Sequence, residues 1–164
     1  MPSALFIMLE RKKMTSYHAR ARATQLHLAL HSVASVLLGI GGIAVFREKQ
    51  ASKHGHLSTT HSWAGAILML LAALNLVQGV LLTVEKQPMN WQWRDETHVF
   101  VGTLAYILSA LTTLYGLYTS SWGHERLGEQ RQTHLAIIIT LAHVVLLGKA
   151  IVISRKRHPH IKRA

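Results

Sequence analysis

The sequence predicts an all-α integral membrane protein whose four helices form an up-and-down bundle. Two observations carry this prediction: four long apolar stretches, and short polar connections between them. About 20 apolar residues are enough for a helix to cross the hydrocarbon core of a bilayer. Of the 164 residues, 49% are apolar and only 15% are charged. Connections of about a dozen residues place consecutive helices antiparallel.

Each expected span begins with a histidine. The four spans run from His27 to Phe46, from His61 to Val84, from His98 to Tyr118 and from His134 to Ile153. Gly39, Gly41 and Gly42 in the first span predict close approach to a neighbouring helix. We expect an apolar stub and a basic segment over residues 1–25, the transmembrane domain over 26–154 and a basic tail over 155–164. No close sequence repeat is visible beyond the recurring histidine.

The positions of the basic residues predict the orientation. Twelve lysines and arginines lie before the first span, in the middle loop or after the last span, and five lie in the other two loops. Basic residues accumulate on the cytoplasmic side, so we expect both termini to be cytoplasmic. The net charge of +11 then predicts contact with anionic lipid headgroups. Nucleic-acid binding is not expected, because no basic groove with interleaved aromatic residues is present.

The absence of cysteine excludes disulfides, thiolate-bound iron–sulfur clusters and a cysteine nucleophile. No signal peptide is expected, because the apolar stretch 2–9 has no basic region before it and no small-residue cleavage site after it. A metal would therefore need nitrogen, oxygen or thioether ligands.

The histidines at the span starts suggest metal centres inside the bundle. Imidazole is costly in lipid without a partner, and it is a common axial ligand of haem iron. In an antiparallel bundle His27 and His98 share one depth, and His61 and His134 share the opposite depth. Two facing imidazoles at one depth can bind both sides of a haem, and His27 with His98 meets this requirement. The alternative is that each histidine lies unliganded among the lipid headgroups.

Two further histidines lie inside the spans. His31 follows His27 by one turn, where it could bond a haem propionate; a hydrogen bond to a neighbouring helix is the simpler interpretation. His143 lies in the middle of the last span, where we expect a hydrogen bond between helices.

Three segments resemble helix starts of the cytochrome b-561 family of transmembrane ascorbate-dependent reductases. Leu57–Gly65, LSTTHSWAG, is similar to the family's His-Ser-Trp-x-Gly motif. Leu26–Ala34, LHLALHSVA, and Thr97–Gly102, THVFVG, resemble the family's other ligand-bearing helix starts. The segment Ala44–Glu48 also fits, and the resemblance covers about residues 20–158.

The resemblance implies haem b as the cofactor. Family members have six helices and bind two haems through four histidines, so His27 and His98 would hold the haem nearer the cytoplasm. His61 would be one ligand of the second haem, whose other ligand lies on an earlier helix that has no counterpart here. The resemblance thus implies a form without the first two helices, with one haem and an incomplete second site. His134 has the depth to substitute, but the resemblance does not assign it that role.

The resemblance also implies an activity. Cytoplasmic ascorbate would give an electron that reaches monodehydroascorbate or ferric iron across an endomembrane, such as the endoplasmic reticulum or a vesicle, or the plasma membrane. Arg20 and Arg22 are candidates for binding ascorbate, although anchoring at the membrane surface explains them equally well. His54 and His56 could contact the acceptor.

Two other functions remain open at this point. One is a truncated, non-catalytic membrane protein that associates with full-length relatives, and the chain could also form a homodimer. The other is a quinone-linked cytochrome b subunit of a larger complex.

Overall fold

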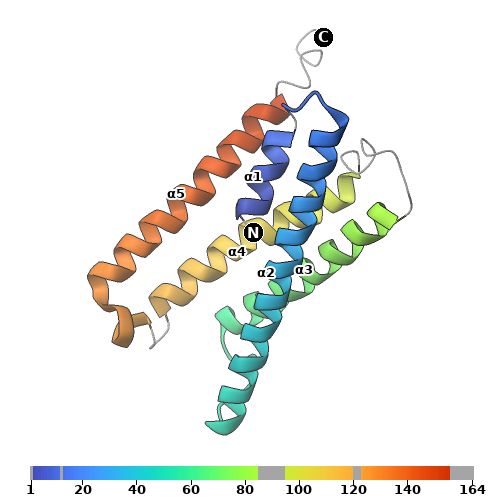
Figure 1. The fold of residues 1–164 in the computed structure, drawn as a ribbon. Helices are drawn as coiled ribbons and strands as arrows, with labels where there is room; N and C mark the ends of the chain where they lie inside the picture. The colour runs from blue at the N-terminus through green and yellow to red at the C-terminus, as the bar shows by residue number, and fades with distance from the viewer. Residues whose placement is uncertain (1, 12, 85–94, 120–122, 156–164) are drawn as a thin grey trace, which may run out of the picture.

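The computed structural model describes residues 2–11, 13–84, 95–119 and 123–155, which are helical apart from short connections and contain no strand. Figure 1 shows the helices as an elongated bundle. In chain order the elements are α1 (Pro2–Arg11), α2 (Tyr17–Ala51), α3 (Thr60–Val84), α4 (Glu96–Thr119), the π-helical turn η1 (Gly123–Leu127) and α5 (Gly128–Arg155). The basic tail and the basic residues of the middle loop, Lys86 and Arg94, lie outside the described residues, except for Arg155 at the end of α5.

Helices α2, α3, α4 and α5 are each long and apolar enough to cross a membrane. At most 22% of the most apolar segment of any of them is buried within the bundle. The remaining apolar surface therefore needs an apolar solvent, which lipid provides. The fold is that of an integral, multi-pass membrane protein, and the predicted fold class is confirmed.

The expected apolar stub is an ordered helix of the bundle. Helix α1 lies between α2 and α5 (Figure 1), and Leu9 packs with Tyr106 of α4 and Leu146 of α5 in a buried cluster. Ten helical residues span about 15 Å, which is half of a hydrocarbon core of ~30 Å. Because α1 is too short to cross a bilayer alone, its apolar composition is satisfied by packing against its neighbours.

The predicted bounds are accurate for α3 and α4 but wrong for α2 and α5. Helix α2 begins ten residues before His27, and α5 begins six residues before His134. With 35 residues, α2 is about 52 Å long and exceeds the hydrocarbon core. Alanine and arginine between Tyr17 and Ala23 are good helix formers, so the helix continues into the polar region before the span.

The three glycines expected to permit close helix approach behave differently. A Cβ atom at Gly42 would lie 2.6 Å from Cε of Met69 on α3, so this glycine does lie against a neighbour. Gly39 and Gly41 have no other side chain within 4 Å of the equivalent position. Only one of the three supports the predicted contact.

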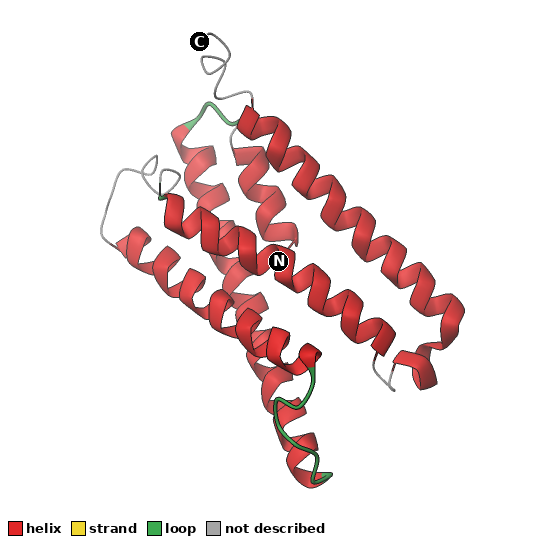
Figure 2. Ribbon diagram, turned by 180° about the vertical axis from the view of Figure 1, so that it is seen from behind, coloured by secondary structure: helices red, strands yellow, loops and turns green. Residues whose placement is uncertain are grey.

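Helices α3 and α4 make the most extensive helix–helix contact. They run antiparallel side by side, and α2 and α5 flank the pair, as both views show (Figures 1 and 2). The starts of α2 and α4 and the ends of α1, α3 and α5 gather at one end of the bundle. This arrangement brings residues near the starts of α2 and α4 to a similar depth.

The topology gives a direct prediction, because the cysteine-free sequence allows single cysteines to report on each side. We expect Ser16→Cys, before α2, to react with an impermeant maleimide from the cytoplasmic side, and Ser58→Cys, before α3, from the opposite side. Both positions are exposed. Labelling of both from the same side of sealed vesicles would contradict the prediction.

Candidate functional site

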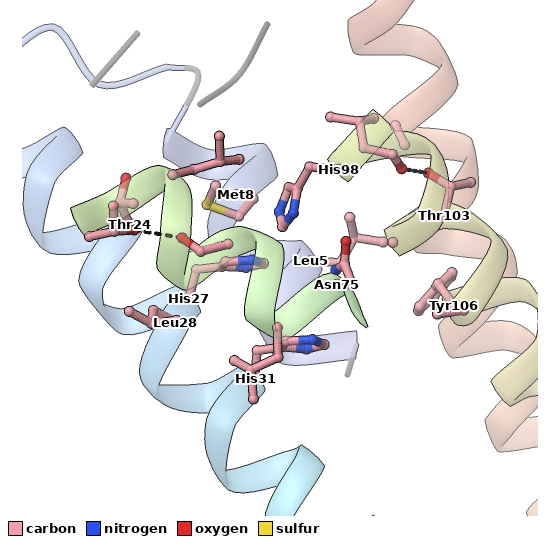
Figure 3. Close-up of a pocket in the computed structure, with 18 of the residues that line it drawn as sticks. Leu5, Met8, Thr24, His27, Leu28, His31, Asn75, His98, Thr103 and Tyr106 are labelled. Carbon is pink, nitrogen blue, oxygen red and sulfur yellow. Dashed lines mark hydrogen bonds between the residues drawn. The ribbon is translucent and has the colours of Figure 1, made fainter. Parts of the chain in front are cut away.

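A largely apolar cavity lies between the helices near the start of α4. Its empty space, including the part open to the surroundings, is about 1220 Å³. Every one of the helices α1 to α5 contributes to its wall, and Figure 3 shows the side chains that point into it. Leu5 and Met8 of α1 form part of the lining, so the segment predicted as an apolar stub closes one side.

Helix α2 contributes two histidines to the cavity. His27 and His31 are one turn apart, and their rings are stacked in parallel, with centroids 6.1 Å apart and planes 3° apart. His31 is buried, and its Nε2 has no hydrogen-bond partner. The expected hydrogen bond of His31 to a neighbouring helix stays a prediction.

Helix α4 contributes His98 from the other side of the cavity (Figure 3). His27, His31 and His98 all line this one cavity. The sequence argument that His27 and His98 share a depth agrees with their common position in this cavity.

Asp95 fixes the start of α4 and thereby the backbone of His98. Its Oδ1 accepts a hydrogen bond of 2.6 Å from the backbone N–H of His98, three residues on, which is the geometry of a helix N-cap. Gln78 of α3 donates its side-chain N–H to the same oxygen at 3.3 Å. The cap therefore joins the end of α3 to the start of α4. The sequence signal for it, an aspartate three residues before His98, was not used in the prediction.

Glycines on the facing helices make room for two histidine rings. A Cβ atom at Gly79 of α3 would lie 3.2 Å from Cε1 of His98, which is tighter than ordinary van der Waals contact. At the opposite end of the pair, a Cβ at Gly116 of α4 would clash with the ring of His61. Each histidine thus lies on a glycine of the neighbouring helix.

The two contacts are related because α3 and α4 carry the same residue types at the same spacings, which we call their shared register. In each helix a glycine follows the first histidine by four residues, a buried polar residue follows it by fourteen, and another glycine follows it by eighteen. The residues are His61, Gly65, Asn75 and Gly79 in α3, and His98, Gly102, Thr112 and Gly116 in α4. Eighteen residues are five full turns, so both ends of the pattern lie on one face. This sparse register is not a close sequence repeat, and it was not predicted from the sequence.

Four buried polar atoms that lack a hydrogen-bond partner belong to side chains lining this one cavity. They are Nε2 of His31, Oδ1 of Asn75, Nδ1 of His98 and the hydroxyl of Tyr106. An unsatisfied buried polar group costs about 1–3 kcal/mol. Such a concentration is typical of a cavity that accommodates a ligand or water.

His61 and His134, which share the other depth in the sequence argument, are not brought together. The ring of His61 is stacked with Tyr115, with centroids 6.4 Å apart, and no second imidazole faces it among the described residues. His134 is exposed, whereas Gln132 and Ala136 of the same helix are buried. Residues two positions apart point about 200° apart on a helix, so His134 faces away from the bundle.

The two candidate arginines occupy different faces of α2. Arg20 precedes His27 by two turns and lies on the same face as Thr24, which lines the cavity. Its carbonyl accepts hydrogen bonds from Thr24 Oγ1 at 3.0 Å and from Nε of Arg11, at the end of α1, at 3.2 Å. Arg22 is exposed on a different face. The structure thus places only Arg20 in line with His27.

His143 differs from the expectation of an interhelical hydrogen bond. Its Nδ1 lies 2.8 Å from the carbonyl of Ile139 in the same helix, a geometry in which the ring N–H donates. Its contact with another helix is ring stacking on Tyr106, with centroids 4.7 Å apart. A carbonyl four residues earlier is the nearest acceptor in a helix, and it competes with acceptors on neighbouring helices.

These features define a membrane helical bundle with facing histidines in an apolar cavity. A family model described as eukaryotic cytochrome b561 matches residues 3–124, and the chain belongs to this family. The match begins in α1, earlier than residue 20, and ends before α5. Neither the curated proteins nor the solved structures contain a match. The family carries out haem-dependent transmembrane electron transfer, and its members bind haem b.

The cap at Asp95 gives a stability prediction. Asp95→Ala should lower the free energy of unfolding by about 1 kcal/mol, because the backbone N–H of His98 loses its acceptor. Asp95→Asn should cost less, since its carbonyl oxygen can still accept. Reversible unfolding in mixed detergents, followed by circular dichroism, measures the difference. The control is Glu96→Ala, which removes an exposed carboxylate from the same turn; an equal loss there would show that the cap is not responsible.

Proposed function

We propose that the protein is a haem b transmembrane oxidoreductase in which His27 and His98 are the two axial ligands. Ascorbate on the cytoplasmic side is the electron donor, and monodehydroascorbate or ferric iron is the acceptor. The observation that supports this most strongly is the pair of imidazoles from α2 and α4 in one apolar cavity. Membership of the cytochrome b561 family supports the reaction class.

The residues present fit a haem. The lining is mostly aliphatic, as the porphyrin ring requires, and two imidazole side chains enter from facing helices. When bound, haem b supplies an iron that accepts and releases one electron at a time. In this chain His27 and His98 would bind the iron, Asp95 would hold the backbone that carries His98, and the aliphatic lining would exclude water. Leu5 and Met8 of α1 would cover the cavity on one side.

Arg20 is the better candidate for binding the ascorbate anion. It lies about 10 Å along the helix from His27 on the same face, which is towards the expected cytoplasmic surface. Arg22 fits a role as a membrane-surface anchor, because it is exposed and directed elsewhere.

The second site is incomplete in the described residues, so we propose one haem per chain. His61 lies against Gly116 and Tyr115, and in the part of the chain that the structure describes it contacts no second imidazole. His134 faces away and is not a substitute ligand in this arrangement. Electron crossing to the far side should therefore be slow. His54 and His56, in the connection between α2 and α3, are candidates for contact with the acceptor.

The open His61 site also favours a second candidate function. A non-catalytic membrane protein that assembles with relatives, or as a homodimer, would need no complete electron path. We propose that either form lies in an endomembrane or the plasma membrane with both termini cytoplasmic. The twelve basic residues before the first predicted span, in the middle loop and after the last span, against five in the other loops, support this orientation.

Purified protein in sealed liposomes tests the main proposal. We expect one haem per chain, rapid haem reduction by external ascorbate, and slow reduction of a ferric reporter trapped inside. His27→Ala and His98→Ala should each lose the low-spin haem spectrum, because a single axial ligand remains. His134→Ala is the matched control and should retain haem, since this side chain is exposed.

Three results would contradict parts of this proposal. Wild-type protein without haem would favour the non-catalytic function. Haem retained in the His27→Ala, His98→Ala double variant would exclude this ligand pair. Two haems per chain with fast crossing would show that another residue completes the site at His61.

The arginines give a further prediction. Arg20→Ala should raise the ascorbate concentration needed for half-maximal haem reduction by roughly fivefold to tenfold, as expected for the loss of one charge-assisted hydrogen bond of ~1–1.5 kcal/mol. Arg22→Ala should change it little. Both variants remove one basic residue from the first turns of α2, so a difference between them reports position rather than net charge. Equal effects would support the anchoring interpretation of both residues.

A further inference from the structure

The shared register of α3 and α4 places a glycine beneath each of two histidines. His98 lies against Gly79, and His61 lies against Gly116, at opposite ends of the same helix–helix seam. The tight approach at Gly79 involves Cε1 of the His98 ring, the carbon between its two nitrogens. A methyl group there would push the part of the ring that includes both possible ligand atoms.

The other restraints on His98 act on its backbone and not on its ring. Asp95 accepts from the backbone N–H, whereas Nδ1 of the ring is buried without a hydrogen-bond partner. Metal-binding histidines usually have the second ring nitrogen hydrogen-bonded, which fixes the orientation of the ring. In its absence, contact with a neighbouring helix is the available means of restricting ring rotation.

We propose that Gly79 is a positioning residue for the proposed haem site: its missing side chain sets the distance and rotation of the His98 imidazole. The inference rests on the proposed ligand role of His98. Gly116 does the same for His61 at the open end of the seam. The two glycines therefore occupy equivalent positions in the register of the pair but differ in the histidine that each one positions.

This difference provides a matched control. Gly79→Ala and Gly116→Ala each add one methyl group to the same seam, and the clash is more severe at Gly116. If the glycines mattered only for helix packing, Gly116→Ala would be the more damaging change. If Gly79 positions the His98 ring, only Gly79→Ala should alter the haem held by His27 and His98. Gly41→Ala, where no other side chain lies within 4 Å, is the neutral control.

The readouts are the g values of the oxidised low-spin haem in electron paramagnetic resonance and its midpoint potential, both of which respond to imidazole orientation. We expect Gly79→Ala to shift both and Gly79→Val to weaken haem retention by roughly tenfold, as for disturbed partners of other metal-binding histidines. Gly116→Ala and Gly41→Ala should leave the spectrum of this haem unchanged. Circular dichroism of every variant reports the helix content.

Two results would overturn the inference: an unshifted spectrum in Gly79→Ala, or an equal or larger shift in Gly116→Ala. Loss of helix content in Gly79→Ala would also overturn it, because the role of the glycine would then be packing. Wild-type protein that binds haem without a bis-imidazole spectrum would instead refute the proposed ligands. The failure of the inference and the failure of the proposed function are thus distinguishable.

Discussion

The antiparallel contact between α3 and α4 is the constraint on which the site depends. Each helix begins with a histidine that lies over a glycine near the end of the other, so the observed register gives both rings the space they need. If the pairing slipped by one turn, each imidazole ring would meet a residue with a side chain instead of a glycine. The spacing of five turns keeps histidine and glycine on one face. The depth of His98, and with it the position of the cavity, follows from this pairing.

The lipid surroundings explain why the buried polar residues between the helices are informative about function. Lipid offers no hydrogen bonds, so an unsatisfied polar group is costly wherever it is buried. Thr112 lies deep in the seam without a partner, and three such side chains, His31, Asn75 and Tyr106, line the cavity with His98. Together the unsatisfied groups of the cavity would cost several kcal/mol, a large part of the 5–15 kcal/mol that stabilises a typical protein. A ligand or water in the cavity would satisfy these groups.

Much of the fold could be predicted because the apolar stretches of α3 and α4 begin and end close to the ends of these helices. In α3 and α4 the apolar stretch starts within two residues of the helix start, so the histidines mark both. In α2 and α5 the helix continues into polar sequence, where apolar length no longer reports the boundary. Helix α1 was predicted only as an apolar stub, because its ten residues are too few to span a bilayer. Its stability comes from tertiary contacts with α2 and α5 that no local pattern reveals.

For the candidate site, the sequence predicted the depth of each residue in the bundle but not the direction in which its side chain points. The depth of a residue follows from the alternating direction of consecutive helices, so the sequence could pair His27 with His98. The direction of a side chain depends instead on how its helix is rotated about its own axis. The rotation of each helix about its own axis places Arg20 and Arg22 on different faces of α2 and turns His134 away from the bundle. The number and spacing of the histidines in the sequence predict neither result. Helix rotation also decides that Gly42 rather than Gly41 meets α3.

The two ends of the central pair differ in what surrounds them, not in how they are built. At the end that carries His98, α2 supplies His27 and His31 and α1 covers the opening; at the other end His61 has the same glycine support but no facing imidazole among the described residues. Helix α5 contributes Leu147 and Ala150 to the cavity wall although it lies beyond the family match. Closure of the site thus depends on the flanking helices α1, α2 and α5, whereas the orientation of the histidines on α3 and α4 depends on the pair itself. If another helix supplied an imidazole opposite His61, the ring of His61 would already be held in place by its contact with Gly116.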